Sequence, residues 1–211
     1  MSQSGKQKPE NTAEPTVRVD APVRTVAVLF ARADSIYKTL PGCEVYDKER
    51  DARNFPGGMP VIAHPPCRAW GKLSHMAKPE PGEKDLAFFA VRMVRENGGI
   101  LEHPASSKLW MEACLPLPGQ PCDEWGGYSV KINQLAFGHK AIKSTWLYIC
   151  GIDKKELPLI PIAMRLATHT VGYNARQKSR RLPEVTKSER EHTPPNLAKW
   201  LIEAARKTRS F

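Results

Sequence analysis

Apolar residues along the chain fall into two kinds of pattern, short unbroken runs and longer segments with helical spacing. The unbroken runs are rich in β-branched residues and are typical of strands buried on both faces of a parallel sheet. The strand patterns lie at 25–30, 44–47, 61–64, 99–103, 128–133 and 144–150. Helical spacing predicts helices at 83–97 and 195–206, and a short helical stretch is expected around 34–40.

The order of these elements predicts how the sheet is built. The strand at 61–64, the helix at 83–97 and the strand at 99–103 are expected to form a right-handed crossover between parallel neighbours. The last two strands are expected to add an antiparallel hairpin at one edge. The predicted fold is therefore a single compact α/β domain over residues 23–211, with a mostly parallel sheet.

Composition narrows the class of protein. Residues 1–22 are polar, contain three prolines and show no periodicity, so we expect a disordered tail there. No apolar run among the 211 residues is long enough for a membrane span, and no signal peptide is apparent. The five cysteines form no disulfide-type spacing. We therefore expect a cytoplasmic protein with reduced thiols and no membrane partner.

Positive charge is concentrated towards the C-terminus. Residues 163–211 hold eleven lysines and arginines against four acidic residues, in a chain whose formal net charge is +10. Such a basic region can bind the phosphates of a nucleic acid, and Arg176, Arg180 and Arg181 are the candidates for these contacts. A solvated basic tail that binds nothing is the alternative.

Two candidate catalytic residues lie where predicted strands run into prolines. Cys67 follows the strand at 61–64 and the pair Pro65-Pro66, so its thiol is held on a stiff loop, and Arg68 or a helix N-terminus is expected to lower its pKa. Glu102 terminates an apolar strand, where a desolvated carboxyl group can keep its proton near neutral pH. A buried structural cysteine and a salt-bridged glutamate are the alternatives.

Parallel strands bring their carboxyl ends to one edge of a sheet, so Cys67 and Glu102 are expected to face the same crevice. A thiol and an acid placed in this way suit attack on a pyrimidine. The sulfur adds to C6 while the acid protonates or hydrogen-bonds the N3 edge, which activates C5 as a nucleophile. The base must then be flipped out of a duplex or already be single-stranded.

The motifs, taken in order, resemble those of the DNA (cytosine-5) methyltransferases. The sequence HPPC at 64–67 is similar to the family's Pro-Cys loop, and ILE at 100–102 is similar to its Glu-Asn-Val strand. Residues 133–151 and 192–198 resemble later motifs, and the whole pattern is loosely similar to short phage-encoded proteins. The resemblance implies a Rossmann-like methyltransferase sheet, S-adenosylmethionine as cofactor and DNA as partner.

The resemblance also implies roles for individual residues. Cys67 is the implied nucleophile and Glu102 the implied acid on the base. The implied contacts of S-adenosylmethionine are Phe30, Asp34, Asp47 and Pro66, with Asp47 on the ribose. The implied contacts of nucleic acid are Arg68, Lys140 and Lys143, besides the basic C-terminal residues. The chain departs from the family after Phe30, where residues 31–35 (ARADS) stand in place of a glycine-rich turn.

Other interpretations stay open at this point. An enzyme that transfers another group to a pyrimidine nucleotide, or a nucleic-acid-binding protein without catalysis, would show the same pattern. Zinc held by His64, Cys67 and His103 is a weaker hypothesis, because their spacing is not that of a zinc finger, and we expect no metal. Trp70 is a candidate for stacking on a base, with a place in the core as the alternative.

Overall fold

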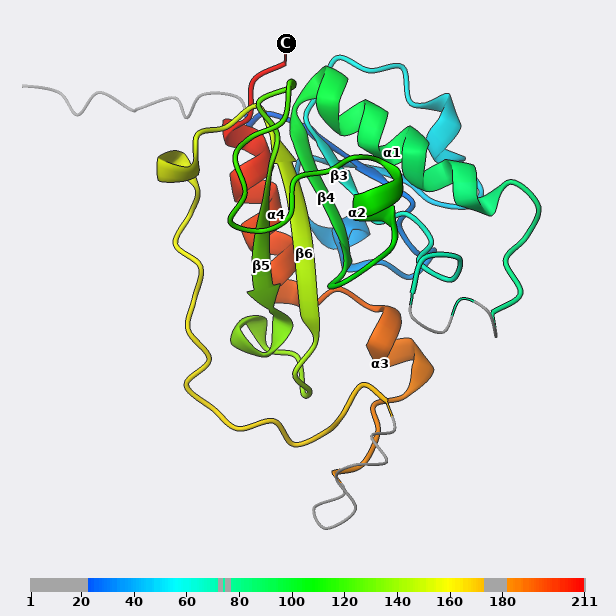
Figure 1. Ribbon diagram of the computed structural model, residues 1–211, viewed down its shortest axis with the longest axis vertical. Helices are drawn as coiled ribbons and strands as arrows, with labels where there is room; N and C mark the ends of the chain where they lie inside the picture. The colour runs from blue at the N-terminus through cyan, green and yellow to red at the C-terminus, as the bar shows by residue number, and fades with distance from the viewer. Residues whose placement is uncertain (1–22, 72–73, 75–76, 173–181, 211) are drawn as a thin grey trace, which may run out of the picture.

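The computed structural model describes residues 23–71, 74, 77–172 and 182–210, so the expected tail at 1–22 lies outside the described residues. A six-stranded sheet forms its centre, with the strands in the order β2, β1, β3, β4, β6, β5 (Figure 1). The strands are β1 (Val26–Leu29), β2 (Cys43–Tyr46), β3 (Val61–Ala63), β4 (Gly99–Pro104), β5 (Tyr128–Asn133) and β6 (Ser144–Cys150).

Strand directions confirm the predicted architecture. β2, β1, β3 and β4 run parallel to one another, whereas β6 runs antiparallel to both β4 and β5. The protein is therefore a single α/β domain with a mixed sheet that is mostly parallel and has an antiparallel part at one edge. The crossover from β3 to β4 passes through α1 (Glu83–Asn97), whose bounds match the predicted helix.

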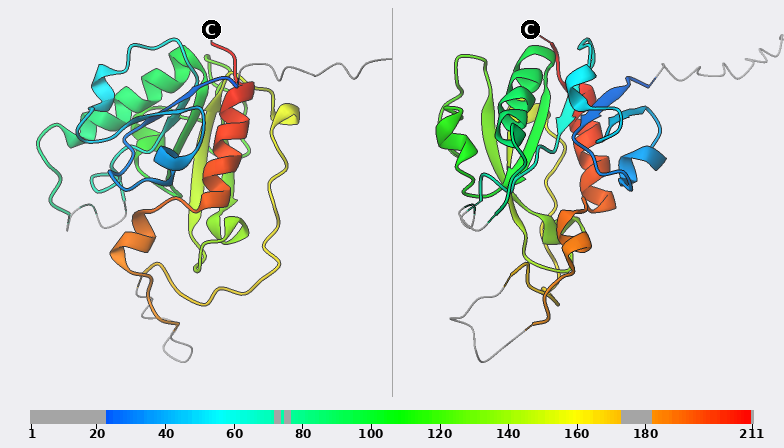
Figure 2. Two further views of the ribbon diagram at one scale, coloured as in Figure 1. Left: turned by 180° about the vertical axis from the view of Figure 1, so that it is seen from behind. Right: turned by 90° about the vertical axis from the view of Figure 1, so that its right-hand side faces the viewer.

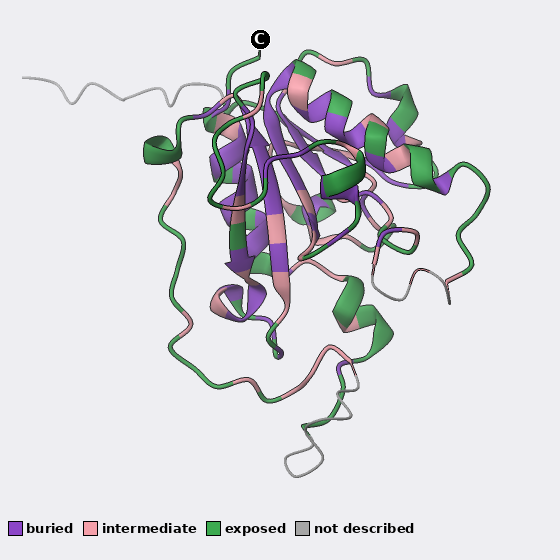
Figure 3. Ribbon diagram, in the orientation of Figure 1, coloured by how far each residue is buried: buried purple, intermediate pink, exposed green. Residues whose placement is uncertain are grey.

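The two long helices cover opposite faces of the sheet, as Figure 2 shows. α4 (Pro195–Lys207) packs on the face to which Val26 and Val28 contribute, and α1 packs on the face of Ala27 and Leu29. Successive side chains of a strand point to opposite faces, so a strand covered on both sides must be apolar at every position. This explains the unbroken apolar runs, and the strands are buried along most of their length (Figure 3).

One glycine makes the crossover possible. Gly99 begins β4 with a φ of 142°, and a Cβ atom there would lie 2.0 Å from the carbonyl oxygen of Val61. The backbones of β3 and β4 thus approach each other at a point where no side chain fits. The same residue lets the chain enter the sheet directly after α1.

Short helical elements lie between and after the strands. They are η1 (Ile36–Thr39), η2 (Ala52–Asn54), α2 (Leu109–Glu112), η4 (Gln134–Phe137), η5 (Lys154–Glu156) and α3 (Lys187–Glu191). The helical stretch expected around 34–40 is thus a single 3-10 turn, η1. α3 lies beyond the carboxyl ends of the parallel strands (Figure 1), and Thr186 and Glu189 close a capping box at its start.

Apolar residues also line one long surface segment. Between η5 and residue 168 the chain runs outside the sheet and exposes Leu159, Ile162, Met164 and Leu166 (Figure 3). Within the ranges that the structure describes, no helix has the length and apolar character required to cross a bilayer.

Candidate functional site

The carboxyl edge of the parallel strands brings together the residues that the sequence singled out. β3 ends at Ala63 and the chain leaves the sheet through His64 and two prolines, while β4 runs on through Glu102 to Pro104. Proline has no backbone N–H to continue the hydrogen-bonding ladder, so β3 and β4 both end at this edge of the sheet. Cys67 follows the first turn and is exposed. The thiol and Glu102 therefore belong to the same edge of the sheet, as predicted.

Two side chains hold the Glu102 carboxylate in place. Its Oε2 atom lies 3.1 Å from Nδ1 of His64, and its Oε1 atom accepts a hydrogen bond of 3.0 Å from Nε2 of Gln134. The Gln134 amide is itself anchored, because Nε2 also donates to Oγ1 of Thr145 at 3.0 Å. Only 14% of the Glu102 side chain is exposed, so its orientation is fixed by these partners.

A tyrosine extends this network behind the histidine. The hydroxyl of Tyr37 lies 3.1 Å from Nε2 of His64, and Tyr37 is the buried residue of η1. Burial, together with the charge of Glu102, raises the pKa of Tyr37 well above its ordinary value, so the phenol keeps its proton. Tyr37 then donates to Nε2, and His64 donates from Nδ1 to the carboxylate, which fixes the tautomer of the imidazole.

The expectation that burial keeps Glu102 protonated is wrong. Burial is the largest influence and does act to raise the pKa, but the hydrogen bond from His64 and the charge of Lys143 outweigh it and lower the pKa to about 2. Glu102 is thus a carboxylate at neutral pH. It can accept a hydrogen bond from a ligand, and it has no proton of its own to give.

The expected activation of Cys67 is also corrected. Desolvation by the surrounding protein raises the pKa of the thiol, and the charge of Glu102 raises it further against the opposing charge of Lys143. Arg68 does not contribute, because its guanidinium pairs with the buried carboxylate of Glu83, with Nε 3.0 Å from Oε1.

Lys140 and Lys143, the implied nucleic-acid contacts, both contact α3. Lys140 pairs with Glu189, and Nζ of Lys143 donates to the carbonyl oxygen of Arg190 at 2.8 Å. Of the two lysines, Lys143 is the one whose charge acts on both Cys67 and Glu102. The candidate phosphate contacts Arg176, Arg180 and Arg181 lie outside the described residues.

Ion pairs fill the position after β1 at which the resemblance places a nucleoside cofactor. Phe30 has a φ of 61°, a left-handed conformation that glycine adopts far more easily. Nε of Arg32 lies 2.9 Å from Oδ1 of Asp34, and the same guanidinium contacts Glu191, the last residue of α3. The other oxygen of Asp34 lies 3.1 Å from Nε2 of His192.

The remaining implied cofactor contacts are also occupied by the protein itself. Asp47 follows β2 as predicted, but Oδ2 accepts from Nζ of Lys38 at 2.6 Å and Oδ1 accepts from two backbone amides at 3.1 Å. The hydrogen bond from Lys38 lowers the pKa of Asp47. Pro66 is half-buried beside Cys67. These residues do not fit S-adenosylmethionine in the family's manner, because side chains replace the glycines and Asp47 already accepts three hydrogen bonds, one of them from Lys38.

Two weaker hypotheses do not agree with the structure. Trp70 is fully buried and packs edge-on against Phe88, so it is a core residue and is not available for stacking on a base. The proposed zinc ligands do not converge, since within the described ranges no three histidine, cysteine or acidic side chains are arranged to hold a metal ion. His103 is buried, and burial lowers its pKa to about 4.

Sequence reasoning missed part of this site. Tyr37 and Gln134 were not recognised as functional residues, and His64 was considered only as a metal ligand. Tyr37 and Gln134 lie in 3-10 turns far from Glu102 along the chain, and no local pattern marks a buried amide as the partner of a distant carboxylate. No family model matches the chain, and no match was found among the curated proteins.

Proposed function

We propose that this protein binds a pyrimidine base of DNA at the carboxyl edge of its sheet, and that the thiol of Cys67 adds to C6 of the ring. The observation that carries this proposal is the Glu102 carboxylate, which is ionised, mostly buried and oriented by His64 and Gln134, at the same edge of the sheet as the exposed thiol of Cys67. Cytosine offers a matching donor, because its exocyclic amine can donate a hydrogen bond to a carboxylate.

The addition is balanced without a cofactor. The bond between sulfur and C6 forms, the C5–C6 double bond is lost, and the thiol proton ends on C5, so the step is the reversible addition of S–H across that double bond. A base that donates to Glu102 also screens the charge that helps to raise the pKa of Cys67. Binding of the base therefore favours the thiolate at the moment at which it is needed.

The motif resemblance to the DNA (cytosine-5) methyltransferases supports the pyrimidine as target. Methyl transfer is not part of the proposal, because Arg32, Asp34 and Asp47 do not fit S-adenosylmethionine. Incubation with a radiolabelled methyl donor and DNA provides the corresponding control. Label in the DNA would show that the cofactor binds in a different pose.

The proposal is tested with a single-stranded DNA oligonucleotide that contains 5-azacytosine. Nitrogen at position 5 takes up the proton after sulfur adds to C6, so the adduct accumulates without a methyl donor. Intact-mass measurement should show one covalent complex with the wild-type protein and none with Cys67→Ser. Cys122→Ser is the matched control, since Cys122 is also exposed, and it should form the adduct normally.

Glu102→Gln should slow formation of the adduct at least tenfold, because the neutral amide lacks the charge that attracts the base's donor group. An RNA oligonucleotide of the same sequence shows whether the sugar matters. The proposal fails if the wild-type protein forms no adduct, or if the adduct survives in Cys67→Ser.

A second candidate function is nucleic-acid binding without covalent chemistry. The raised pKa of Cys67 favours it, because most of the thiol is protonated at neutral pH. In that case binding of unmodified DNA should weaken steeply with salt and should be the same for the wild type and Cys67→Ser.

A further inference from the structure

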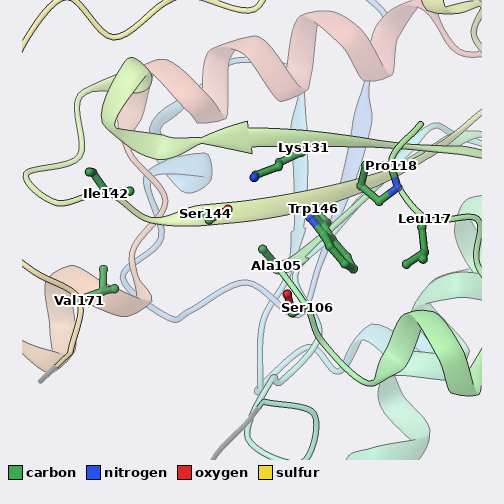
Figure 4. Close-up of a pocket in the computed structure, with 9 residues that line it drawn as sticks. All are labelled: Ala105, Ser106, Leu117, Pro118, Lys131, Ile142, Ser144, Trp146 and Val171. Atoms are coloured by element: carbon green, nitrogen blue, oxygen red, sulfur yellow. The ribbon is translucent and has the colours of Figure 1, made fainter. Parts of the chain in front are cut away.

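A pocket of about 620 Å³ lies over the antiparallel part of the sheet (Figure 4). Its volume falls within the roughly 300–1,000 Å³ of small-molecule sites. Strands β5 and β6 form its floor, and the loops after β4 and α2 form part of its wall. The lining residues are Ala105, Ser106, Leu117, Pro118, Lys131, Ile142, Ser144, Trp146 and Val171.

The register of the strands places this pocket relative to the Cys67 site. Trp146 pairs with His103 of β4 and with Lys131 of β5, so these three side chains share one face of the sheet. Glu102 is the neighbour of His103 along the strand and points to the other face. The pocket and the Glu102 carboxylate thus lie on opposite sides of the end of β4.

The loop after β4 lies between the pocket and the Cys67 site. Ala105 and Ser106 line the pocket, and the amide of Lys108 in the same loop donates to the carbonyl oxygen of Trp70 at 3.0 Å, just after Cys67. The loop after β4 is therefore hydrogen-bonded to the loop that carries the thiol. An extended ligand that crosses the loop after β4 can reach both the pocket and the Cys67 site.

The lining combines an aromatic ring, aliphatic side chains, one cation and two hydroxyl groups. Trp146 is half-buried and presents part of its indole to the pocket, and aliphatic side chains such as Ile142 and Leu117 stand at the rim. In the described part of the chain the exposed Lys131 forms no ion pair, so its ammonium is free to meet an anion. The hydroxyls of Ser106 and Ser144 add hydrogen-bonding groups beside it.

The loop itself is held in an unusual conformation. Ser106 has a φ of 63°, in the left-handed region that residues with a side chain seldom adopt. Ala105 is fixed next to it by a hydrogen bond of 3.1 Å from its amide to the carbonyl oxygen of Ser144. Strain of this kind persists where the surrounding structure enforces it, and it is common in loops that hold ligands.

We propose that this pocket is a second nucleotide subsite, which receives a base of a single-stranded nucleic acid against Trp146 and its phosphate at Lys131. The proposal rests on the proposed function, since the same strand would place its target base between Cys67 and Glu102. A base has an aromatic face whatever its identity, so this subsite supplies affinity rather than sequence selectivity.

The test measures binding of a fluorescein-labelled single-stranded oligonucleotide without reactive bases by fluorescence anisotropy. Lys131→Glu should weaken binding at least tenfold, and Trp146→Leu should weaken it roughly 5- to 150-fold, because a base stacked on an aromatic side chain contributes about 1–3 kcal/mol. Lys199→Glu is the matched control. Lys199 is exposed on α4 at the other face of the sheet, and its substitution should change the affinity less than threefold.

Two further measurements keep the outcomes distinct. Trp146→Phe keeps an aromatic face and should bind within a few-fold of the wild type. If thermal unfolding shows that Trp146→Leu is unstable, the subsite is tested by Lys131→Glu, because Lys131 is exposed. Wild-type affinity in both Lys131→Glu and Trp146→Leu overturns the subsite. Adduct formation between wild-type Cys67 and free 5-aza-2'-deoxycytidine reports on the proposed function alone. If it fails while oligonucleotide binding still depends on Lys131, the subsite stands without the covalent chemistry.

Discussion

Glu102 offers the sharpest test of the electrostatics at the site. The hydrogen bond from His64 and the charge of Lys143 hold its pKa at about 2, against an ordinary value of 4.5, even though burial acts in the opposite direction. A carboxyl group whose pKa is lower in the folded state stabilises the fold above its unfolded pKa. That contribution is lost as the pH falls through the folded pKa.

The size of the effect follows from this shift. Each unit of pKa corresponds to about 1.4 kcal/mol, so Glu102 should contribute about 3 kcal/mol to the free energy of unfolding at pH 6, and about 2 kcal/mol of this should be lost by pH 3. Glu102→Gln cannot titrate. The difference in stability between the wild type and this variant should therefore grow by about 2 kcal/mol from pH 3 to pH 6.

Urea unfolding followed by circular dichroism at pH 3, 4, 5 and 6 measures this difference. Glu96→Gln on the exposed side of α1 is the matched control, and its difference from the wild type should stay within about 0.5 kcal/mol over the same range. A flat difference for Glu102→Gln, or one that shrinks as the pH rises, would show that Glu102 is not a stabilised carboxylate. The proposed recognition of a base amine would then lose its acceptor.

Three other results are expected. The pH midpoint for alkylation of Cys67 by iodoacetamide, measured by peptide mass spectrometry, should lie above that of an ordinary thiol. Glu102→Gln should lower this midpoint because it removes one cause of the raised pKa, and an unchanged midpoint would contradict this. Gly99→Ala should destabilise the protein by more than about 4 kcal/mol in thermal unfolding, since its Cβ would lie 2.0 Å from the Val61 carbonyl oxygen; a near-native Tm would contradict the tight crossover. Thr186→Ala should cost about 1 kcal/mol by removing the cap of α3, seen as faster hydrogen exchange of its first amides, and unchanged exchange would show that the cap contributes nothing.

The architecture was largely predictable because the signals for it are local. The strands at 61–63 and 99–104 and the helix between them follow from apolar spacing, and a crossover between parallel strands has one favoured hand. The elements that the sequence did not predict are the short helices α2, α3, η2, η4 and η5. Each spans only three to five residues, which is too short for a periodic pattern to appear.

The candidate site was predictable only in its position. Parallel strands bring Cys67 and Glu102 to one edge whatever their neighbours are, and the prolines show where each strand ends. The protonation of these groups was predicted wrongly. For Glu102 it depends on His64 and Lys143, which lie 38 and 41 positions from Glu102 along the chain.

The sequence by itself thus determined the α/β class, the crossover, and the edge at which the thiol and the carboxylate meet, because each of these follows from periodicity and strand direction. Tertiary structure alone decided that Glu102 is ionised, that the pKa of Cys67 is raised and that Arg32 pairs with Asp34 and Glu191 at the position after β1. Charge and hydrogen bonding act through space over a few ångströms. The partners that set them come from segments whose proximity is fixed only when the sheet and its helices have packed.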